Sequence, residues 1–274
     1  MFMERFDLRK RLSAFPWKSA LVLSVGILLL GWLLETPAGL LGKADAIGYA
    51  VCHRIDVRSF HINGRPLPLC ARCSGMYLGA MLGLVFLSLT SRRRGGLPPR
   101  GIQVLLGVFV LAFGIDGLNS FFSLIPGFPT LYQPQNWLRL VTGTGMGLVI
   151  AAFLFPAFNQ TVWREWDPRP ALGSWKLLSG LIALAAVVDL ALLSERPLIL
   201  YPLALISAAG VMVILTMVYS MLWLMAFKRE NRYENVVQLG MVLVGGFGTA
   251  LLQIALLDFV RYFFTGSWGG FHLG

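Results

Sequence analysis

Seven long apolar stretches constrain this chain more than any other feature of its sequence. A helix that crosses the hydrocarbon of a bilayer needs about 20 mostly apolar residues. Stretches that meet this requirement lie at about residues 18–41, 75–89, 102–124, 138–155, 175–193, 198–227 and 236–264. Only 13% of the residues are charged, against about 25% in soluble domains. We therefore predict an all-α integral membrane protein with about seven transmembrane helices.

The first stretch has some features of a cleavable signal peptide. Basic residues precede it, and Ala44-Asp45-Ala46 resembles a cleavage site. Its apolar run, however, exceeds the 7–15 residues that are typical of a signal peptide. We expect it to be retained as the first span.

The basic residues predict how the spans are oriented. Fifteen of the 23 Lys and Arg residues fall on one side if the spans alternate. They are Arg5, Arg9, Lys10, Arg11, Lys18, Arg92, Arg93, Arg94, Arg100, Arg164, Arg169, Lys176, Lys228, Arg229 and Arg232. The positive-inside rule then places the amino terminus in the cytoplasm and the carboxyl terminus on the exoplasmic side. The net charge of +10 is thereby explained as membrane anchoring, and no nucleic-acid partner is expected.

This orientation divides the chain into three parts. We expect a basic cytoplasmic segment at residues 1–17, a single polytopic membrane domain at residues 18–264 and an exoplasmic tail at residues 265–274. Glycine-rich runs at residues 143–147 and 245–248 lie inside apolar stretches. A phosphate-binding loop would follow a strand, so we interpret these glycines as sites of close helix packing.

A Cys/His cluster lies in the predicted exoplasmic loop after the first span. Cys70 and Cys73 form a C-x-x-C motif, and Cys52 and His53 precede it by a turn-rich insert. Three thiolates and one imidazole match the ligands of a structural zinc site. We therefore predict Cys52, His53, Cys70 and Cys73 as metal ligands, with His61 in reserve. Adjacent side chains rarely point at one ion, so binding by only one of Cys52 and His53 is also compatible with the motif.

Three interpretations of the cluster stay open. It can bind a metal, for which zinc is preferred over copper or nickel. Alternatively, Cys70 and Cys73 can alternate between a dithiol and a disulfide. The oxidising exoplasmic side favours this second interpretation, and Arg72 and the helix start at Cys73 would lower the pKa of a thiol. In the third interpretation, the cluster only pins the loop to the membrane surface.

Particular residues in and after this loop carry a family resemblance. They are Cys52-His53, Arg58-Ser59-Phe60, Gly64, Pro68-Leu69-Cys70-Ala71-Arg72-Cys73, Gly75, Tyr77, Gly79, Asp116-Gly117, Asn136, Arg139, Thr142, Gly143 and Gly147. In these residues the chain resembles the bacterial membrane protein family named domain of unknown function 2085, over about residues 45–150. The resemblance implies a type of fold and a set of recurring residues, but no activity.

Ionisable residues also occur within the predicted spans, where they are costly and mark function by default. Glu35, Asp116, Asp189 and Asp258 all fall in the exoplasmic halves of their spans under the predicted orientation. We therefore predict a polar cavity beneath the Cys/His loop. Its residues, or those supporting the metal ligands, are Arg58, Ser59, Asp116, Asn119, Asn136, Arg139, Asp189, Asp258 and Arg261. In the alternative, Asp116–Arg139 and Asp258–Arg261 are ion pairs that only hold helices together.

Three functional hypotheses follow from these observations. In the first, a metal-binding membrane protein acts on a lipid or membrane-embedded substrate, or in a transport step. In the second, a thiol–disulfide oxidoreductase passes electrons towards a quinone. In the third, the chain is a non-catalytic subunit of a membrane complex. The three hypotheses together leave open whether the chain is an enzyme. All three place it in a bacterial cytoplasmic membrane, with the lipid bilayer and membrane-protein partners or further copies as its contacts.

Overall fold

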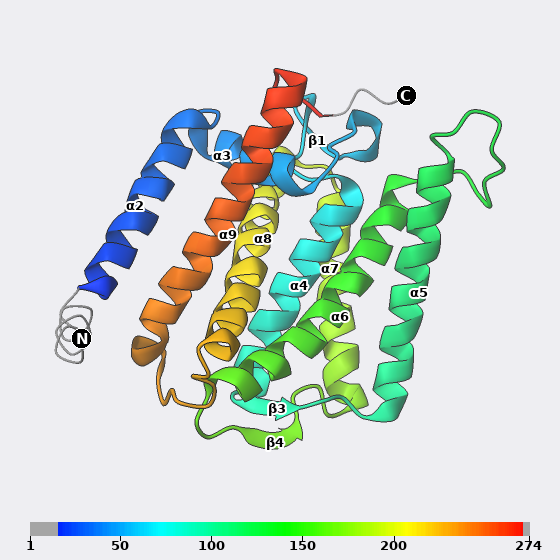
Figure 1. Ribbon diagram of the computed structural model, residues 1–274. Coiled ribbons are helices and arrows are strands. Elements are labelled where there is room, and N and C mark those ends of the chain that lie inside the picture. Colours follow the sequence, from blue (N-terminus) through cyan, green and yellow to red (C-terminus); the bar gives the residue numbers. More distant parts are fainter. Residues whose placement is uncertain (1–15, 271–274) are drawn as a thin grey trace, which may run out of the picture.

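The computed structural model describes residues 16–270, which form a bundle of long helices lying side by side (Figure 1). Seven of these helices are long and apolar enough to cross a membrane. They are α2 (Trp17–Glu35), α4 (Ala71–Thr90), α5 (Arg100–Phe122), α6 (Asn136–Val162), α7 (Trp175–Leu193), α8 (Pro197–Ala226) and α9 (Val236–Thr265). The prediction of an all-α membrane protein is confirmed. Most of the predicted basic segment and the end of the predicted tail, residues 1–15 and 271–274, lie outside the described residues.

The prediction for the first span was wrong at its carboxyl end. The helix α2 ends at Glu35, and the chain resumes as a separate helix, α3 (Gly39–Val51). Pro37 explains the break, because a residue before proline avoids the helical conformation and Thr36 is extended. The Lys43 ammonium donates to the main-chain oxygen of Thr36 at 2.8 Å, which satisfies a carbonyl at the end of α2. The additional helix α3 leads the chain directly to Cys52.

Two short sheets join the connections between the spans. The strands β1 (His61–Ile62) and β2 (Arg65–Pro66) form an antiparallel hairpin, preceded by the short 3-10 helix η1 (Asp56–Arg58). The turn residues of the hairpin, Asn63 and Gly64, have φ angles of 50° and 80°, as tight two-residue hairpins require. At the opposite end of the bundle, β3 (Arg94–Gly96) pairs in parallel with β4 (Asp167–Pro170).

Small residues bring α4 and α6 into close contact. A Cβ atom added to Gly79 would lie 2.6 Å from the main-chain oxygen of Thr144. A Cβ on Gly143 would overlap the main-chain oxygen of Arg72, and one on Gly147 would overlap that of Met76. This is the small-residue helix packing that replaces hydrophobic association inside a bilayer. It holds α6 against the start of α4, where Cys70 and Cys73 lie.

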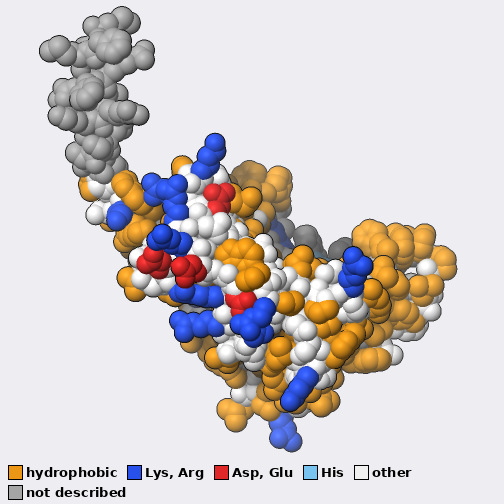
Figure 2. All heavy atoms as spheres, turned by 90° about the horizontal axis from the view of Figure 1, so that it is seen from below, with side chains coloured by type: hydrophobic (Ala, Val, Ile, Leu, Met, Phe, Trp, Pro, Cys, Tyr) orange, Lys and Arg blue, Asp and Glu red, His pale blue; other side chains and the backbone are white. Residues whose placement is uncertain are grey.

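The two ends of the bundle differ in their charged residues. The connections between α4 and α5, α6 and α7, and α8 and α9 lie at one end, together with the start of α2 (Figure 1). Figure 2 shows that Lys and Arg side chains gather on this end among fewer acidic ones. The hairpin, α3 and the start of α4 lie at the other end.

Candidate metal centre

The three cysteines reach one place from two separate segments. Cys52 follows the last turn of α3 in an extended conformation, and Cys70 is the residue that caps the start of α4. Cys73 lies in the first turn of α4. Between these segments, the β1–β2 hairpin folds the intervening residues back, and Leu67 donates its main-chain N–H to the oxygen of Phe60 at 2.9 Å. The turn-rich insert therefore closes a loop that brings the cysteines together.

The sulfur atoms form a compact triangle. The Sγ atoms of Cys52, Cys70 and Cys73 all lie within 4.8 Å of one another. Tetrahedral bonds of about 2.3 Å from zinc to sulfur would set the sulfurs about 3.8 Å apart. All three cysteines are free thiols, and Cys52 and Cys70 are buried. The triangle can therefore hold a thiolate-binding ion after a small contraction.

Hydrogen bonds between the thiols favour a negative charge on Cys52. The Cys70 N–H also donates to the Cys52 sulfur at 3.4 Å. Donation from the Cys70 and Cys73 thiols lowers the pKa of Cys52 well below its ordinary value, against the effect of burial. The same interaction with Cys52 raises the pKa of Cys70. The thiolate form is the one that ligates metals and attacks disulfides. The three cysteines are therefore compatible with either metal binding or disulfide chemistry.

The two histidines that were considered as ligands lie outside the triangle of sulfur atoms. The Nδ1 atom of His53 lies 3.9 Å from the Cys52 sulfur and accepts the Ile55 N–H at 3.4 Å. His53 is not part of the three-thiol triangle. His61, the reserve ligand, instead lies 3.1 Å from a carboxylate oxygen of Asp56. His53 thus lies beside the triangle, and His61 belongs to the hairpin surface.

An apolar layer surrounds the thiols on the side of the later spans. Leu69, Val211 of α8 and Ile254 of α9 are buried against Cys52 and Cys70, and Trp32 of α2 packs against the same cluster. Such a surrounding excludes water and strengthens electrostatic interactions within the site. The later spans therefore complete the surroundings of cysteines that come from the first part of the chain.

Arginine side chains fix the loop that carries Cys52. Arg261 of α9 donates to the main-chain oxygen of Cys52 at 2.7 Å, and its guanidinium lies 4.0 Å from the ring centre of Tyr49. Arg54 forms an ion pair with Asp45 at 2.8 Å. The contacts of Arg261 tie the end of α3 to α9, and the Arg54 pair ties the loop back to α3. They place positive charge beside the Cys52 thiol.

A second polar network lies next to Cys73. Arg72 pairs with the carboxylate of Asp116, which is 1% exposed, and donates to the Ser120 hydroxyl at 2.9 Å. Tyr132 donates its hydroxyl proton to the other oxygen of Asp116 at 2.8 Å. The suggested Asp116–Arg139 pair was therefore wrong, because the carboxylate takes Arg72 as its partner. Arg139 instead donates to Asn136 at 2.8 Å.

Most of the other predicted polar residues join this network. Arg58 donates to the main-chain oxygen of Ser120 at 2.7 Å. Asn136 donates to the main-chain oxygen of Ser59 at 3.4 Å, and Asn119 donates to that of Tyr132 at 2.9 Å. The loop, α5 and α6 are thereby joined beneath the hairpin.

The remaining acids lie in other surroundings. Asp189 accepts the Thr144 hydroxyl proton at 2.7 Å, and Asp258 accepts the indole N–H of Trp32 at 3.0 Å. Glu35 is exposed at the end of α2. Arg72, Ser120 and Tyr132 were missing from the predicted site. Only the position of Arg72 within the C-x-x-C motif offered a signal for any of them.

The fold and this site together define a multi-pass α-helical membrane protein with a cluster of three thiols, two of them buried. The sequence profile of the predicted membrane protein family DUF2085 matches residues 52–153. A protein of Methanothermobacter thermautotrophicus, described as uncharacterized, is 32% identical over 102 residues, which are 37% of this chain and 81% of the relative. This chain belongs to the DUF2085 family.

A second relative extends the comparison. An uncharacterized protein of Methanocaldococcus jannaschii is 25% identical over 121 residues, which are 44% of this chain and 72% of that protein. No solved structure matches the chain. The matched segment contains the three thiols, Arg72, Asp116 and Arg139, but not α8 or α9, which close the apolar side of the site.

Proposed function

We propose that this membrane protein holds a transition metal ion, with zinc preferred, on the thiolates of Cys52, Cys70 and Cys73. The observation that carries the proposal is the convergence of three sulfur atoms within 4.8 Å from segments separated by a hairpin. Soft thiolate ligands select zinc or copper(I) over magnesium or calcium. The proposed ion would join α3 to α4 and stabilise the loop between them.

The charge around the site supports this assignment. A zinc ion with three thiolates carries a net charge of −1, which is costly in apolar surroundings unless it is compensated. Arg58 and Arg139 are buried and lie close enough to interact electrostatically with Cys70. Arg261 interacts in the same way with Cys52. These three cations supply the compensating positive charge, whereas the charge of Asp116 is already paired with Arg72.

We propose His53 as the fourth ligand. Its Nδ1 atom lies 3.9 Å from the Cys52 sulfur, and on binding the ion it would give up the Ile55 N–H that it accepts at 3.4 Å. A bound His53 would give a closed, structural site. If a water or substrate takes the fourth position instead, the site has the open coordination of catalytic zinc.

The proposal is tested by measuring metal in the purified full-length protein. We expect about one zinc ion per chain, and loss of that zinc in Cys52→Ser and Cys70→Ser. His53→Ala should weaken metal retention, whereas His61→Ala serves as the matched control and should retain it. Wild-type protein without stoichiometric metal, and with freely alkylated thiols, would contradict the proposal.

Thiol–disulfide exchange by Cys70 and Cys73 is the second candidate, and the proximity of their free thiols, which lie within 4.8 Å of one another, favours it. Oxidation of the Cys70 and Cys73 thiols would form a disulfide and release two electrons and two protons, which a membrane quinone accepts as it becomes a quinol. Alkylation followed by mass measurement separates the two functions. A reversible Cys70–Cys73 disulfide in metal-free wild-type protein would favour exchange over metal binding.

We also propose that the thiol end of the bundle is exoplasmic and that the amino terminus is cytoplasmic. The bases gathered at the opposite end support this orientation (Figure 2), since Lys and Arg are enriched in cytoplasmic connections. Both relatives come from archaea. We therefore propose a cytoplasmic membrane as the location without restricting the proposal to bacteria.

A further inference from the structure

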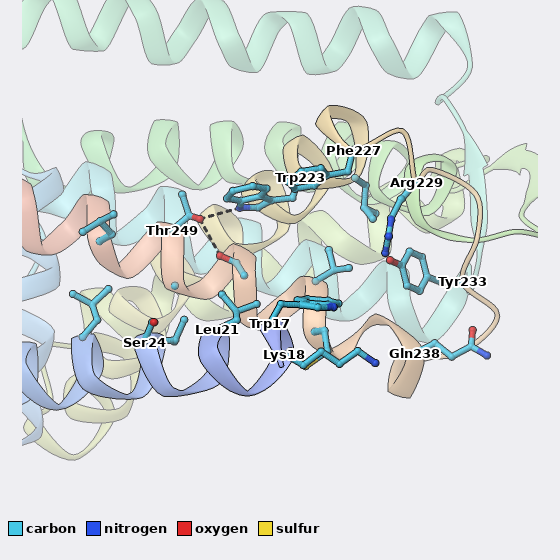
Figure 3. A pocket seen from close by; sticks show the side chains of 18 residues that line it. Trp17, Lys18, Leu21, Ser24, Trp223, Phe227, Arg229, Tyr233, Gln238 and Thr249 are labelled. Carbon is cyan, nitrogen blue, oxygen red and sulfur yellow. Dashed lines mark hydrogen bonds between the residues drawn. The ribbon is translucent and has the colours of Figure 1, made fainter. Parts of the chain in front are cut away.

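A second site lies at the end of the bundle far from the thiols. A cavity of about 710 Å³ opens between α2, the end of α8 and the first half of α9. Figure 3 shows that Lys18, Arg229, Tyr233 and Gln238 lie towards one end of it, and that Ser24 and Thr249 lie towards the other. Its length is otherwise lined mostly by aliphatic and aromatic side chains, including Leu21, Val25 and Leu252. The cavity therefore has a charged end and an apolar interior.

The charged end lies at the depth of the lipid headgroups. The charged end of the cavity lies at three helix ends, since α2 begins at Trp17, α8 ends at Ala226 and α9 begins at Val236. Ends of membrane helices lie at the boundary between hydrocarbon and water. Trp17 lines the cavity at this boundary, where tryptophan is enriched in membrane proteins.

The apolar interior extends through one leaflet. Along α2, the lining residues run from Lys18 to Leu28, and a helix rises 1.5 Å per residue, which gives about 15 Å. That is half of the roughly 30 Å hydrocarbon thickness of a bilayer. The cavity thus matches the depth of the acyl chains that a lipid of one leaflet extends into the membrane.

The two bases at the mouth carry charge that no acid neutralises within residues 16–270. Neither Lys18 nor Arg229 takes part in an ion pair there, whereas the nearby Arg164 pairs with Glu234 at 2.9 Å. Lys18 only approaches the Trp17 ring, with 5.8 Å from its Nζ to the ring centre. Two unneutralised cations at headgroup depth are complementary to a lipid phosphate.

Local packing keeps the cavity open. Gly245 and Gly248 of α9 face α2, and a Cβ on Gly248 would lie 2.5 Å from a methyl group of Val25. The helices therefore touch at Gly248. At Gly245 the nearest atom to an added Cβ is 3.9 Å away, on Leu21, so space remains. Trp223 is held at the cavity wall by a hydrogen bond from its indole N–H to Thr249 at 2.9 Å.

We propose that this cavity binds an anionic phospholipid of the adjacent leaflet. The phosphate lies between Lys18 and Arg229, and an acyl chain runs along α2 towards Leu28. This inference does not depend on the thiol site, because the two sites lie at opposite ends of the bundle. Its failure would therefore leave the metal proposal untouched.

Native mass spectrometry of the full-length protein tests the site, with phosphatidylglycerol and phosphatidylcholine added separately. We expect tighter binding of phosphatidylglycerol, and an affinity about tenfold weaker in the Lys18→Gln/Arg229→Gln variant, since bases near a lipid phosphate contribute individually. Arg92→Gln/Lys228→Gln is the matched control, because it removes two bases that do not line the cavity. The control should bind phosphatidylglycerol as the wild type does.

A second variant tests the apolar interior. Gly245→Leu adds a side chain where the backbone leaves room, so it should fold and lose binding of both lipids at this site. The thermal unfolding midpoint in detergent provides the check that this variant and the charge variant are folded. Equal binding of phosphatidylglycerol by the wild type and Lys18→Gln/Arg229→Gln would overturn the proposal. Unchanged lipid binding in Gly245→Leu would overturn it as well.

Discussion

Arg72 and Asp116 form an ion pair that connects the C-x-x-C motif of α4 to the middle of the polar network on α5. The Arg72 guanidinium bonds the carboxylate of Asp116 and also the main-chain oxygen of the same residue at 2.9 Å. Asp116 is 1% exposed, and the Arg72 side chain is 16% exposed. The residue between the two cysteines is therefore held from outside its own helix. A substitution of Asp116 should therefore also affect the thiols of Cys70 and Cys73.

We expect Asp116→Asn to destabilise the protein by about 3 kcal/mol, because removing one member of a buried ion pair leaves the other charge uncompensated. Thermal unfolding in detergent measures this loss. Asp189→Asn is a suitable comparison, since Asp189 accepts only a neutral hydroxyl and should lose about 1 kcal/mol. Equal effects of the two substitutions would show that the ion pair with Arg72 stabilises the protein no more than the hydrogen bond of Asp189 does.

The contact between α4 and α6 predicts that a glycine substitution in α4 is destabilising, and a glycine of α5 provides the comparison. Gly79→Ala would place a Cβ 2.6 Å from the main-chain oxygen of Thr144, and we expect a loss of about 1–3 kcal/mol from overpacking. A Cβ on Gly107 of α5 meets nothing within 4 Å, so Gly107→Ala should be neutral or stabilising. Unfolding midpoints of the two variants provide the measurement. A stable Gly79→Ala protein would contradict the close contact.

The proposed orientation predicts which surface positions are accessible from outside the cell. Val57, in the loop before the hairpin, is 69% exposed, and Glu165 is exposed at the opposite end of the bundle. In intact cells, a membrane-impermeant maleimide should label Val57→Cys but not Glu165→Cys, which should react only after lysis. The wild type measures background from the native thiols. The reverse labelling pattern would invert the orientation.

Metal removal should destabilise the wild-type protein, because an ion that binds only the folded state adds stability by mass action. A chelator is therefore expected to lower the unfolding temperature and to increase alkylation of Cys52. Cys52→Ser should unfold at a lower temperature from the outset and respond little to the chelator. If the chelator changes neither property of the wild type, the ion does not contribute to folding.

The sequence predicted the spans well because long apolar runs in a bilayer allow few other structures. The span at Trp175–Leu193 has the predicted bounds, whereas the first span was drawn too long. Leu40 and Leu41 continue the apolar composition past Pro37, so composition hides a break that the backbone of proline imposes. The helix α3, with Asp45 buried against Arg54, has no periodicity that would separate it from the span before it.

The sequence predicted the three thiols that lie together in the candidate site, but not the ion pair of Arg72 and Asp116 beside them. The spacing alone predicted that Cys52 lies near Cys70 and Cys73, because a turn-rich insert between them allows the chain to fold back. The pair of Arg72 and Asp116, by contrast, joins residues 44 positions apart, and Arg139 offered an equally charged alternative. The choice between the two guanidinium groups depends on how α4, α5 and α6 pack together, and spacing in the sequence does not reveal that tertiary geometry.

X-ray absorption at the zinc edge of the purified wild-type protein tests the central claim most directly. Three sulfur neighbours at about 2.3 Å and one nitrogen at about 2.0–2.1 Å are expected for a site of Cys52, Cys70, Cys73 and His53. In His53→Ala, the three sulfurs should remain, and the imidazole nitrogen should be replaced by an oxygen ligand such as water. A zinc spectrum with only oxygen or nitrogen neighbours, or the absence of bound metal, would contradict the thiolate site.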